Sequence, residues 1–224
     1  MKRSEINQLQ REAVAFFNKQ RFYLPKWAHW TKQDWIKNKD RAKEIFENKL
    51  GWDLTDFGLD DFYHTGLLLF TIRNGKVGDP EGKTYAEKAM IVQENQVTPW
   101  HFHWNKMEDI INRGGGNLVI ELCNSTEDEK LANTTVKVQV DGITHEVEPK
   151  GKIILQPGES ISLPAYLYHQ FYGEKGKGTV LVGEVSRVND DEKDNRFLEP
   201  IGRFPKIEED EPPFYYLCNE YPVL

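Results

Sequence analysis

The sequence lacks the features that would place it in a membrane, outside the cell or on nucleic acid. No run of 18 or more apolar residues occurs among its 224 residues, so no transmembrane helix is expected. The N-terminus starts basic, but charged and amide side chains interrupt it where a signal peptide needs an apolar stretch. The net charge is -7 without a local basic cluster, which argues against a nucleic-acid partner.

Cysteine is also scarce. The two cysteines, Cys123 and Cys218, suit a reduced cytoplasmic protein better than a secreted one, and the alternative is a structural disulfide between them. Hydrophobic residues make up 38% of the sequence and aromatic residues 12%, which is enough to form the core of one large domain. We therefore expect a cytoplasmic protein with no membrane or nucleic-acid partner.

Hydrophobic spacing predicts a helical arm at the N-terminus, over residues 1–60. From residue 4 to about 19, apolar residues recur at three- and four-residue steps, which predicts a helix that Ser4 caps. A second helix is predicted from a cap at Thr31 to a stop near Gly51.

Beyond this arm the hydrophobic period changes to two, which indicates β-strands. Short strand candidates follow one another, separated by turn residues such as Asn74-Gly75. Many short strands with few helices predict an all-β fold, an antiparallel sandwich or barrel, over residues 61–190. The last segment, 191–224, holds several aromatic residues, so we expect an ordered tail packed on the barrel or on a second subunit.

The densest chemistry in the sequence is a group of histidines and one glutamate. His101, His103 and Glu108 fall in one short segment, and His169 follows in a later strand candidate. Because alternate side chains of a strand share a face, His101 and His103 project to the same side. Glu108 can return to that face after the next turn, and His169 is the best candidate for a fourth ligand. Such nitrogen and oxygen ligands suit Mn²⁺, Fe²⁺, Co²⁺, Ni²⁺ or Zn²⁺.

The spacing of these residues resembles the two metal-binding motifs of cupins, which are jelly-roll β-barrels. The first motif is matched by His101, Phe102, His103, Glu108 and Gly115. The second motif is matched by Gly158, Pro164 and His169. Departures from the usual residues are Asn95, Tyr166 and Gly173, while all four predicted ligands are present.

Over nearly its whole length the chain resembles the D-lyxose isomerase family, bacterial cupin-fold sugar isomerases. The matching stretches are FYLP (22–25), TPWHFHW (98–104), EDIINRGGGNL (108–118), GEVS (183–186), NRF (195–197), GRF (202–204), IEEDEP (207–212) and LCNEYP (217–222). The resemblance implies an enzyme of carbohydrate metabolism, an intramolecular oxidoreductase. It would interconvert D-lyxose and D-xylulose, and secondarily D-mannose and D-fructose. It also implies Mn²⁺ as the metal and a homodimer.

Such an isomerase must move a proton between C1 and C2 of the open-chain sugar, so it needs a general base near the metal. A metal that chelates O1 and O2 would polarise the carbonyl and stabilise a cis-enediolate. Glu184 is our first candidate for the base, since alternation places it on one face of its strand with apolar neighbours. Lys106, in the turn before Glu108, is the second candidate, as a proton shuttle or hydroxyl ligand. The alternative for both is an ordinary solvated side chain.

Three further residues are weaker candidates for contacts to sugar hydroxyls: Lys88, Arg187 and Glu199. Two functions of other classes also stay open, namely another metal-dependent cupin enzyme, such as an Fe(II) dioxygenase, and a non-catalytic sugar-binding cupin. A phosphosugar isomerase is a nearer alternative, but no arginine pair near the motifs would hold a phosphate. A single metal with a carboxylate base favours a cis-enediol route over a hydride shift.

Overall fold

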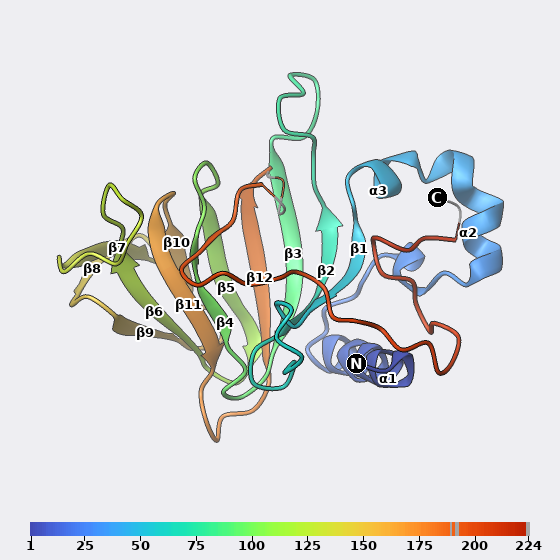
Figure 1. Ribbon diagram of the computed structural model, residues 1–224, viewed down its shortest axis with the longest axis horizontal. Helices are drawn as coiled ribbons and strands as arrows, with labels where there is room; N and C mark the ends of the chain where they lie inside the picture. Colours follow the sequence, from blue (N-terminus) through green and yellow to red (C-terminus); the bar gives the residue numbers. More distant parts are fainter. Residues whose placement is uncertain (189, 191–192, 223–224) are drawn as a thin grey trace.

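The structure is a computed structural model that describes residues 1–188, 190 and 193–222. Positions 189, 191–192 and 223–224, which fall in the predicted barrel and tail, lie outside the described residues. Two sheets form the body of the molecule, with helices gathered at one end (Figure 1). The strand order is β1-β2-β3-β12-β5-β10-β7-β8 in the eight-stranded sheet and β13-β4-β11-β6-β9 in the five-stranded sheet.

The strands are short, as the sequence predicted. Their bounds are β1 Gly51–Thr55, β2 Leu67–Arg73, β3 Tyr85–Val92, β4 Thr98–Phe102, β5 Glu108–Gly115, β6 Leu118–Asn124, β7 Val136–Val140, β8 Ile143–Val147, β9 Gly151–Leu155, β10 Ser160–Leu163, β11 Leu167–Gly173, β12 Val180–Arg187 and β13 Arg196–Phe197. Neighbouring strands pair antiparallel in both sheets. The predicted antiparallel fold of the cupin, jelly-roll type, with N-terminal helices, is confirmed.

An apolar core fills the space between the two sheets. Leu69, Met90 and Val182 enter it from the eight-stranded sheet, and Ile120 and Phe171 from the five-stranded sheet. Strand alternation explains the arrangement, because every second side chain of each strand turns toward the opposite sheet. Burial of these apolar side chains is the main force that holds the sheets together.

A second apolar cluster lies between the helices and the β1–β2 end of the eight-stranded sheet. Ile6 and Phe17 of α1 (Arg3–Lys19) pack there with Trp52 of β1, Phe70 of β2 and Leu181 of β12. The cluster uses the alternate residues of these strands that do not point into the main core. The eight-stranded sheet is therefore covered on both faces at this end (Figure 1).

The helical arm is shorter than the predicted range 1–60. Its helices after α1 are α2 Lys32–Asn38 and α3 Lys43–Glu47, with single 3₁₀ turns at Lys26–His29 and Lys39–Arg41. Residues 51–55 instead form β1, which pairs with β2 at the edge of the eight-stranded sheet. A five-residue strand carries too little periodicity to be separated from the preceding helix by sequence, and its partner lies beyond the arm.

The second predicted helix begins as expected but breaks midway. Thr31 and Asp34 form a capping box at its start. At its end the Asn38 side-chain amide donates to the carbonyl of Asp34, at 2.8 Å. A side chain that takes a carbonyl of the preceding turn competes with the helical backbone, and the chain passes through a 3₁₀ turn before α3 begins.

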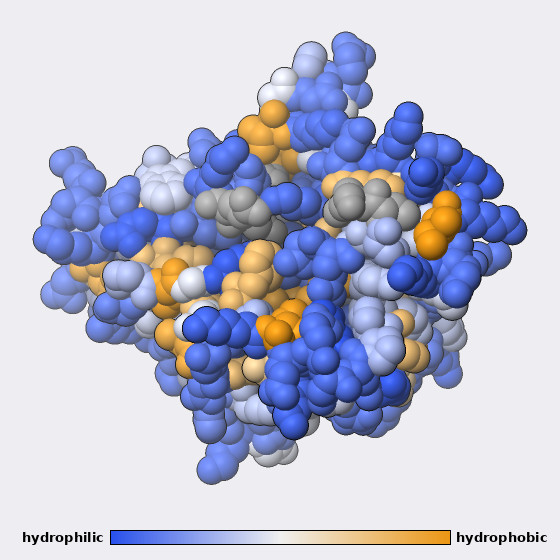
Figure 2. All heavy atoms as spheres, turned by 45° about the vertical axis from the view of Figure 1, so that its right-hand side comes forward, coloured by the Kyte–Doolittle hydropathy of each residue, from blue (hydrophilic) through white to orange (hydrophobic). Residues whose placement is uncertain are grey.

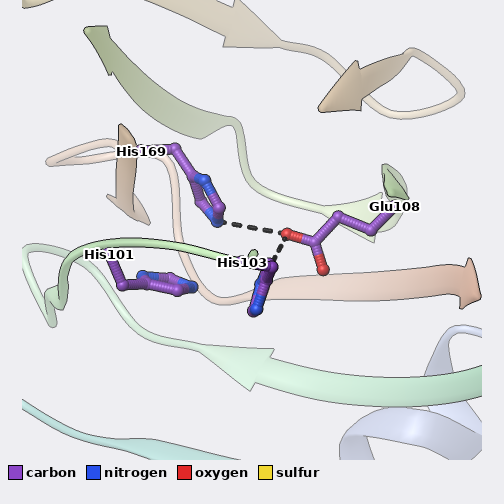
Figure 3. A group of neighbouring side chains, drawn as sticks. All are labelled: His101, His103, Glu108 and His169. Carbon is purple, nitrogen blue, oxygen red and sulfur yellow. Dashed lines mark ion pairs between the residues drawn. The ribbon is translucent and has the colours of Figure 1, made fainter. Parts of the chain in front are cut away.

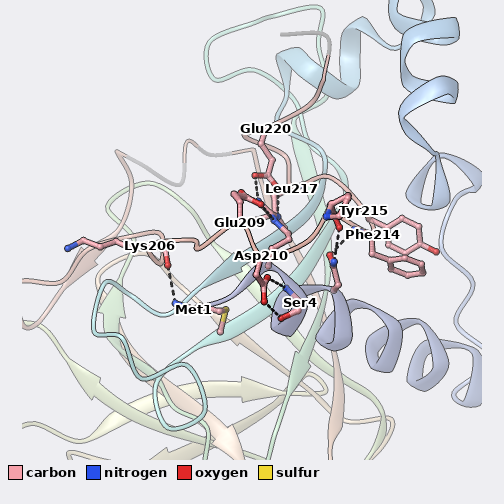
Figure 4. A network of polar contacts seen from close by, with 12 residues as sticks. Met1, Ser4, Lys206, Glu209, Asp210, Phe214, Tyr215, Leu217 and Glu220 are labelled. Carbon is pink, nitrogen blue, oxygen red and sulfur yellow. Dashed lines mark hydrogen bonds and ion pairs between the residues drawn. The ribbon is translucent and has the colours of Figure 1, made fainter.

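The prediction that Ser4 caps the first helix is wrong. Helix α1 starts at Arg3, and its N-cap, Lys2, makes no side-chain hydrogen bond. The cap comes instead from the C-terminal tail, where the Asp210 carboxylate accepts from the Ser4 backbone N–H at 2.9 Å and from its hydroxyl at 2.6 Å (Figure 4). Tertiary structure thus supplies an acceptor that local sequence could not reveal.

Arg3 joins the same two ends of the chain. Its guanidinium donates to the carboxylates of Glu209 and Glu220, with four contacts between 2.7 and 2.9 Å. The N-terminal ammonium donates to the Lys206 carbonyl at 3.0 Å. The tail is therefore anchored along α1, consistent with an ordered tail.

Hydrophilic side chains dominate the face of the molecule seen in Figure 2, with apolar patches between them. Within the described part of the chain, no helix has the length and apolar character needed to span a bilayer. Both cysteines are buried and neither forms a disulfide, so the alternative of a disulfide between Cys123 and Cys218 is excluded.

Candidate metal centre

The structure brings the four predicted ligands together. His101 and His169 are register partners on the neighbouring strands β4 and β11, His103 follows the end of β4, and Glu108 opens β5 in the opposite sheet. One nitrogen or oxygen of each residue lies within 4.8 Å of those of the other three, and all four residues are buried (Figure 3). The group thus draws on both sheets.

Backbone carbonyls orient all three imidazoles in the same way. The Nδ1 partners are the carbonyl of Pro99 for His101 at 2.8 Å, of Asp194 for His103 at 3.0 Å and of Leu167 for His169 at 3.0 Å. A carbonyl only accepts, so each Nδ1 carries the proton and donates it. Each Nε2 is then left with a free lone pair, the form in which histidine binds a metal.

The donor set fits a divalent transition metal. Nε2 of His103 and of His169 is buried and has no hydrogen-bond partner among the described residues. These atoms lie 3.4 and 3.1 Å from Glu108 Oε1. Two ligands at right angles around one ion, each about 2.1 Å from it, would be about 3.0 Å apart. Converging buried lone pairs without a donor between them are costly unless a cation satisfies them.

The protonation states suit the same role. Burial lowers the pKa of His101 well below its usual range, and the neighbouring His169 and His103 add to the effect. Burial by itself would raise the pKa of Glu108, but the charge of Lys106 and the imidazoles of His103 and His169 outweigh it and hold that pKa well below its usual range. Neutral imidazole and ionised carboxylate are the forms that bind a metal.

A chain of buried charges continues from Glu108 away from the histidines. The Lys106 ammonium lies 2.6 Å from Glu108 Oε2 and 2.9 Å from Glu184 Oε1, and the Lys88 ammonium lies 3.3 Å from the same Glu184 oxygen. Ser186 donates its hydroxyl to that oxygen at 3.1 Å. Only 2% of Lys106 and 5% of Glu184 is exposed, so the alternative of solvated side chains does not apply to either residue.

These groups line one cavity between the sheets. Its wall is partly apolar, from Phe57, Leu67, Leu69, Met90, Ile110, Phe171 and Phe197. Its polar part contains the charged chain together with His101 and His103. An apolar cavity with a few convergent polar groups is typical of small-molecule sites.

The C-terminal tail forms one side of this cavity. Strand β13 pairs with β4, and the Phe197 ring lies 5.3 Å from the His101 ring. Asn195 and Arg203 of the tail also line the cavity.

Two of the predicted sugar contacts lie elsewhere. Arg187 is exposed at the end of β12, on the face opposite Ser186, and Glu199 is exposed beyond β13. Neither residue lines the cavity, so we do not retain them as substrate contacts. Alternation along β12 explains the first case, and the irregular path of the tail explains the second.

Sequence reasoning missed Asp194. Its carboxylate accepts hydrogen bonds from the Asn105 backbone and side-chain amides, at 2.9 and 3.0 Å, and from the Lys106 backbone N–H at 3.0 Å. Its carbonyl is the partner of His103 already described. One tail residue thus holds both a predicted ligand and the turn that carries Lys106. No periodicity or motif marks it, because it lies in irregular chain.

Fold and site together define a cupin whose buried histidines and glutamate could hold a metal ion. The model of the D-lyxose isomerase family matches residues 1–221. The D-lyxose/D-mannose isomerase of Serratia proteamaculans is 52% identical over 99% of this chain and 98% of its own length. The enzyme of the same name from Escherichia coli O157:H7 is 50% identical, with the same coverage. The chain belongs to the D-lyxose isomerase family, as its motifs predicted.

Solved structures with the same fold include two L-ribose isomerases. That of Cellulomonas parahominis without ligand has a TM-score of 0.61 at 13% identity, over 93% of this chain and 98% of its own. That of Acinetobacter sp. DL28 in complex with L-ribose has a TM-score of 0.59 at 16% identity, over 89% of this chain and 93% of its own. At this identity the likeness supports the fold.

Proposed function

We propose that this protein is a metal-dependent aldose–ketose isomerase that interconverts D-lyxose and D-xylulose, and secondarily D-mannose and D-fructose. The observation that carries the proposal is the buried group of His101, His103, Glu108 and His169 beside the paired Glu184 and Lys106 in one cavity. Relatives at 50% and 52% identity bear the name D-lyxose/D-mannose isomerase. Both aldoses share their configuration at C2 and C3, so they present the same reacting end.

The four ligands would hold a divalent ion, which we propose is Mn²⁺. Bound there, it would polarise the sugar carbonyl as a Lewis acid. The Lys106 ammonium between Glu108 and Glu184 keeps these two carboxylates apart and offsets their charge.

The reaction moves one proton from C2 to C1 and another from O2 to O1. Glu184 is the proposed base that takes the proton from C2 and returns it to C1 through a cis-enediol. Lys106 is the proposed group that holds or shuttles the proton between the oxygens, and Lys88 the proposed contact to a sugar hydroxyl; their ion pairs with Glu184 support both roles. Both ammonium groups lie within 3.3 Å of the proposed base. Their fixed positive charge would stabilise the negative charge that develops on the sugar during the reaction, because the site is buried.

We further propose a cytoplasmic homodimer in which the segment 61–190 carries the four metal ligands, and residues 1–60 and the tail 191–224 support them. Two buried cysteines without a disulfide support a reducing compartment. Strands β8 and β9 end their sheets, and such edges favour pairing with a second subunit.

The test is a sugar assay on metal-stripped protein. D-lyxose, D-mannose, D-xylose and L-ribose would be incubated with and without Mn²⁺, and ketose formation followed. We expect metal-dependent xylulose from D-lyxose, none from His103→Ala, and normal activity from His64→Ala, a matched control whose side chain is 82% exposed. No ketose from any sugar with metal bound would refute the proposal. Oxygen consumption would then point to a dioxygenase, and sugar binding without conversion to a binding protein.

A further inference from the structure

Strand β4, which carries His101, is irregular beside the site. Along β4 and β11 the register pairs are His101 with His169 and Thr98 with Phe171. Three steps along β4 thus span two along β11, which places a β-bulge at Pro99–Trp100. Proline lacks a backbone N–H and is found within strands at such bulges. In a regular strand Thr98 would face away from His101, and the bulge brings the two side chains to one face.

Thr98 lines the cavity, and its hydroxyl has no partner among the residues that the structure describes. Thr98 is 4% exposed and lines the same cavity as His101 and Glu108. Its Oγ1 is buried and makes no hydrogen bond to any described residue. A buried hydroxyl is nearly always paired in a native protein, so an unpaired one at a functional site calls for a ligand group.

A second threonine in the same cavity shows the contrast. Thr55 Oγ1 accepts from the Phe57 backbone N–H at 2.9 Å and donates to the Arg203 carbonyl. Its hydroxyl therefore ties β1 to the tail, and its one donor is already used. Thr98 has the same side chain, lines the same cavity and is also buried, but its hydroxyl makes no hydrogen bond within the described part of the chain.

We propose that Thr98 binds the sugar through a hydroxyl at C3, C4 or C5, outside the C1–C2 unit that reacts. This inference rests on the proposed function and adds a residue that recognises the remainder of the sugar. A threonine hydroxyl can donate and accept, as can a sugar hydroxyl, so the two groups match. The β-branched side chain on a strand is restricted in rotation, which holds the hydroxyl in place before the sugar arrives. Thr98 is thus a specificity residue, and a site group built to pair with a hydroxyl disfavours sugars that lack it.

The test compares Thr98→Val, Thr98→Ser and Thr55→Val in the metal-loaded enzyme. Melting temperature without sugar, metal content, and kcat/KM on D-lyxose and on its 3-, 4- and 5-deoxy analogues would be measured. We expect Thr98→Val to keep its metal and its melting temperature, since it replaces an unpaired hydroxyl with a methyl group. Its kcat/KM on D-lyxose should fall about tenfold, the loss of one neutral hydrogen bond. Thr98→Ser should retain most activity, and Thr55→Val should melt earlier.

The deoxy sugars identify the contacted hydroxyl. On the analogue that lacks the contacted hydroxyl, wild type and Thr98→Val should have equal kcat/KM. On each of the other two analogues, the kcat/KM of Thr98→Val should still be about tenfold below that of wild type. The inference is overturned if Thr98→Val acts on D-lyxose within twofold of wild type, or if it melts earlier as Thr55→Val does. It is also overturned if all three analogues lose activity equally. A wild-type enzyme that converts no sugar would refute the proposed function itself, and this inference with it.

Discussion

Two networks of charged side chains join distant parts of this chain, and they differ in what they leave unpaired. At the termini, Arg3 is buried and every contact of its guanidinium goes to Glu209 or Glu220. In the cavity, Lys106 links Glu108 to Glu184, but Nε2 of His103 beside them has no hydrogen-bond partner in the described part of the chain.

The difference separates stability from function. A network whose donors and acceptors satisfy one another holds two segments together and has no capacity left for a ligand. Exposure points the same way, since the Glu209 side chain is 59% exposed whereas that of Glu184 is 7% exposed. Buried charges with uncommitted lone pairs are costly to maintain, and they occur where binding or chemistry uses them. Four experiments test whether the cavity network serves function and the terminal network serves stability.

The largest effect is expected in the cavity, from Glu184→Gln. Loss of the proposed base should lower kcat by about 10²- to 10⁴-fold, because an amide cannot take a proton from carbon. Metal content should stay near that of wild type. Glu121→Gln, on the five-stranded sheet where the carboxylate pairs with Lys152, is the matched control and should keep its kcat. A Glu184→Gln enzyme with wild-type kcat would assign the base elsewhere.

A smaller loss is expected from Asp194→Asn, which disturbs the link between the tail and the cavity. An asparagine side chain can accept with only one of its two former oxygens, so the turn that carries Lys106 loses a hydrogen bond. The backbone carbonyl to His103 remains, so metal content should hold while kcat falls about 10-fold, as for other outer supports of metal sites.

Asp141→Asn is the matched control for that change. Asp141 also holds a turn, through the Ser160 backbone and hydroxyl, but lies away from the cavity, so kcat should not change. If Asp194→Asn had normal kcat and a lower melting temperature, the role of Asp194 would be structural.

In the terminal network a substitution should lower stability and leave activity nearly unchanged. Arg3→Leu removes the partner of two carboxylates, and we expect the free energy of unfolding to fall by about 1–2 kcal/mol. The expected loss of stability is smaller than for a fully buried ion pair, because the exposed Glu209 carboxylate can be hydrated once Arg3 is gone. Activity at 25 °C should stay within about twofold of wild type. Denaturant unfolding measures the first quantity and the sugar assay the second.

Lys130→Leu is the control for this change. It breaks a surface pair with Asp128 and should alter stability by less than about 0.5 kcal/mol. An activity loss in Arg3→Leu without a stability loss would contradict the division between the two networks.

The smallest effect is a pH dependence of the tail contact. The Ser4 hydroxyl and backbone N–H lower the pKa of Asp210 below its usual value, and the Arg3 guanidinium lowers that of Glu209. Because the folded pKa lies below the unfolded one, this stabilisation is present above about pH 4 and is lost as the pH falls toward the folded pKa. The melting temperature should therefore decline below about pH 4, and less steeply in Asp210→Asn. Equal slopes for both proteins would contradict the assignment.

The sequence by itself determined the family, the antiparallel fold and the four residues that gather at the site. These depend on local patterns: a period of two along strands, and motif spacing that puts His101 and His103 on one face. The burial of Glu184 also followed from alternation along its strand.

The other features of the fold and site depend on tertiary structure, since each of them needs a partner far away in the sequence. Strand β1 exists because β2 pairs with it, and α1 is capped by Asp210 rather than by its own Ser4. Thr98 faces the cavity because β4 bulges against β11, a shift of register that strand alternation does not reveal. Asp194 reaches His103 because the tail returns over the sheet, and pairings of this kind are set by long-range packing and hydrogen bonding rather than by local preference.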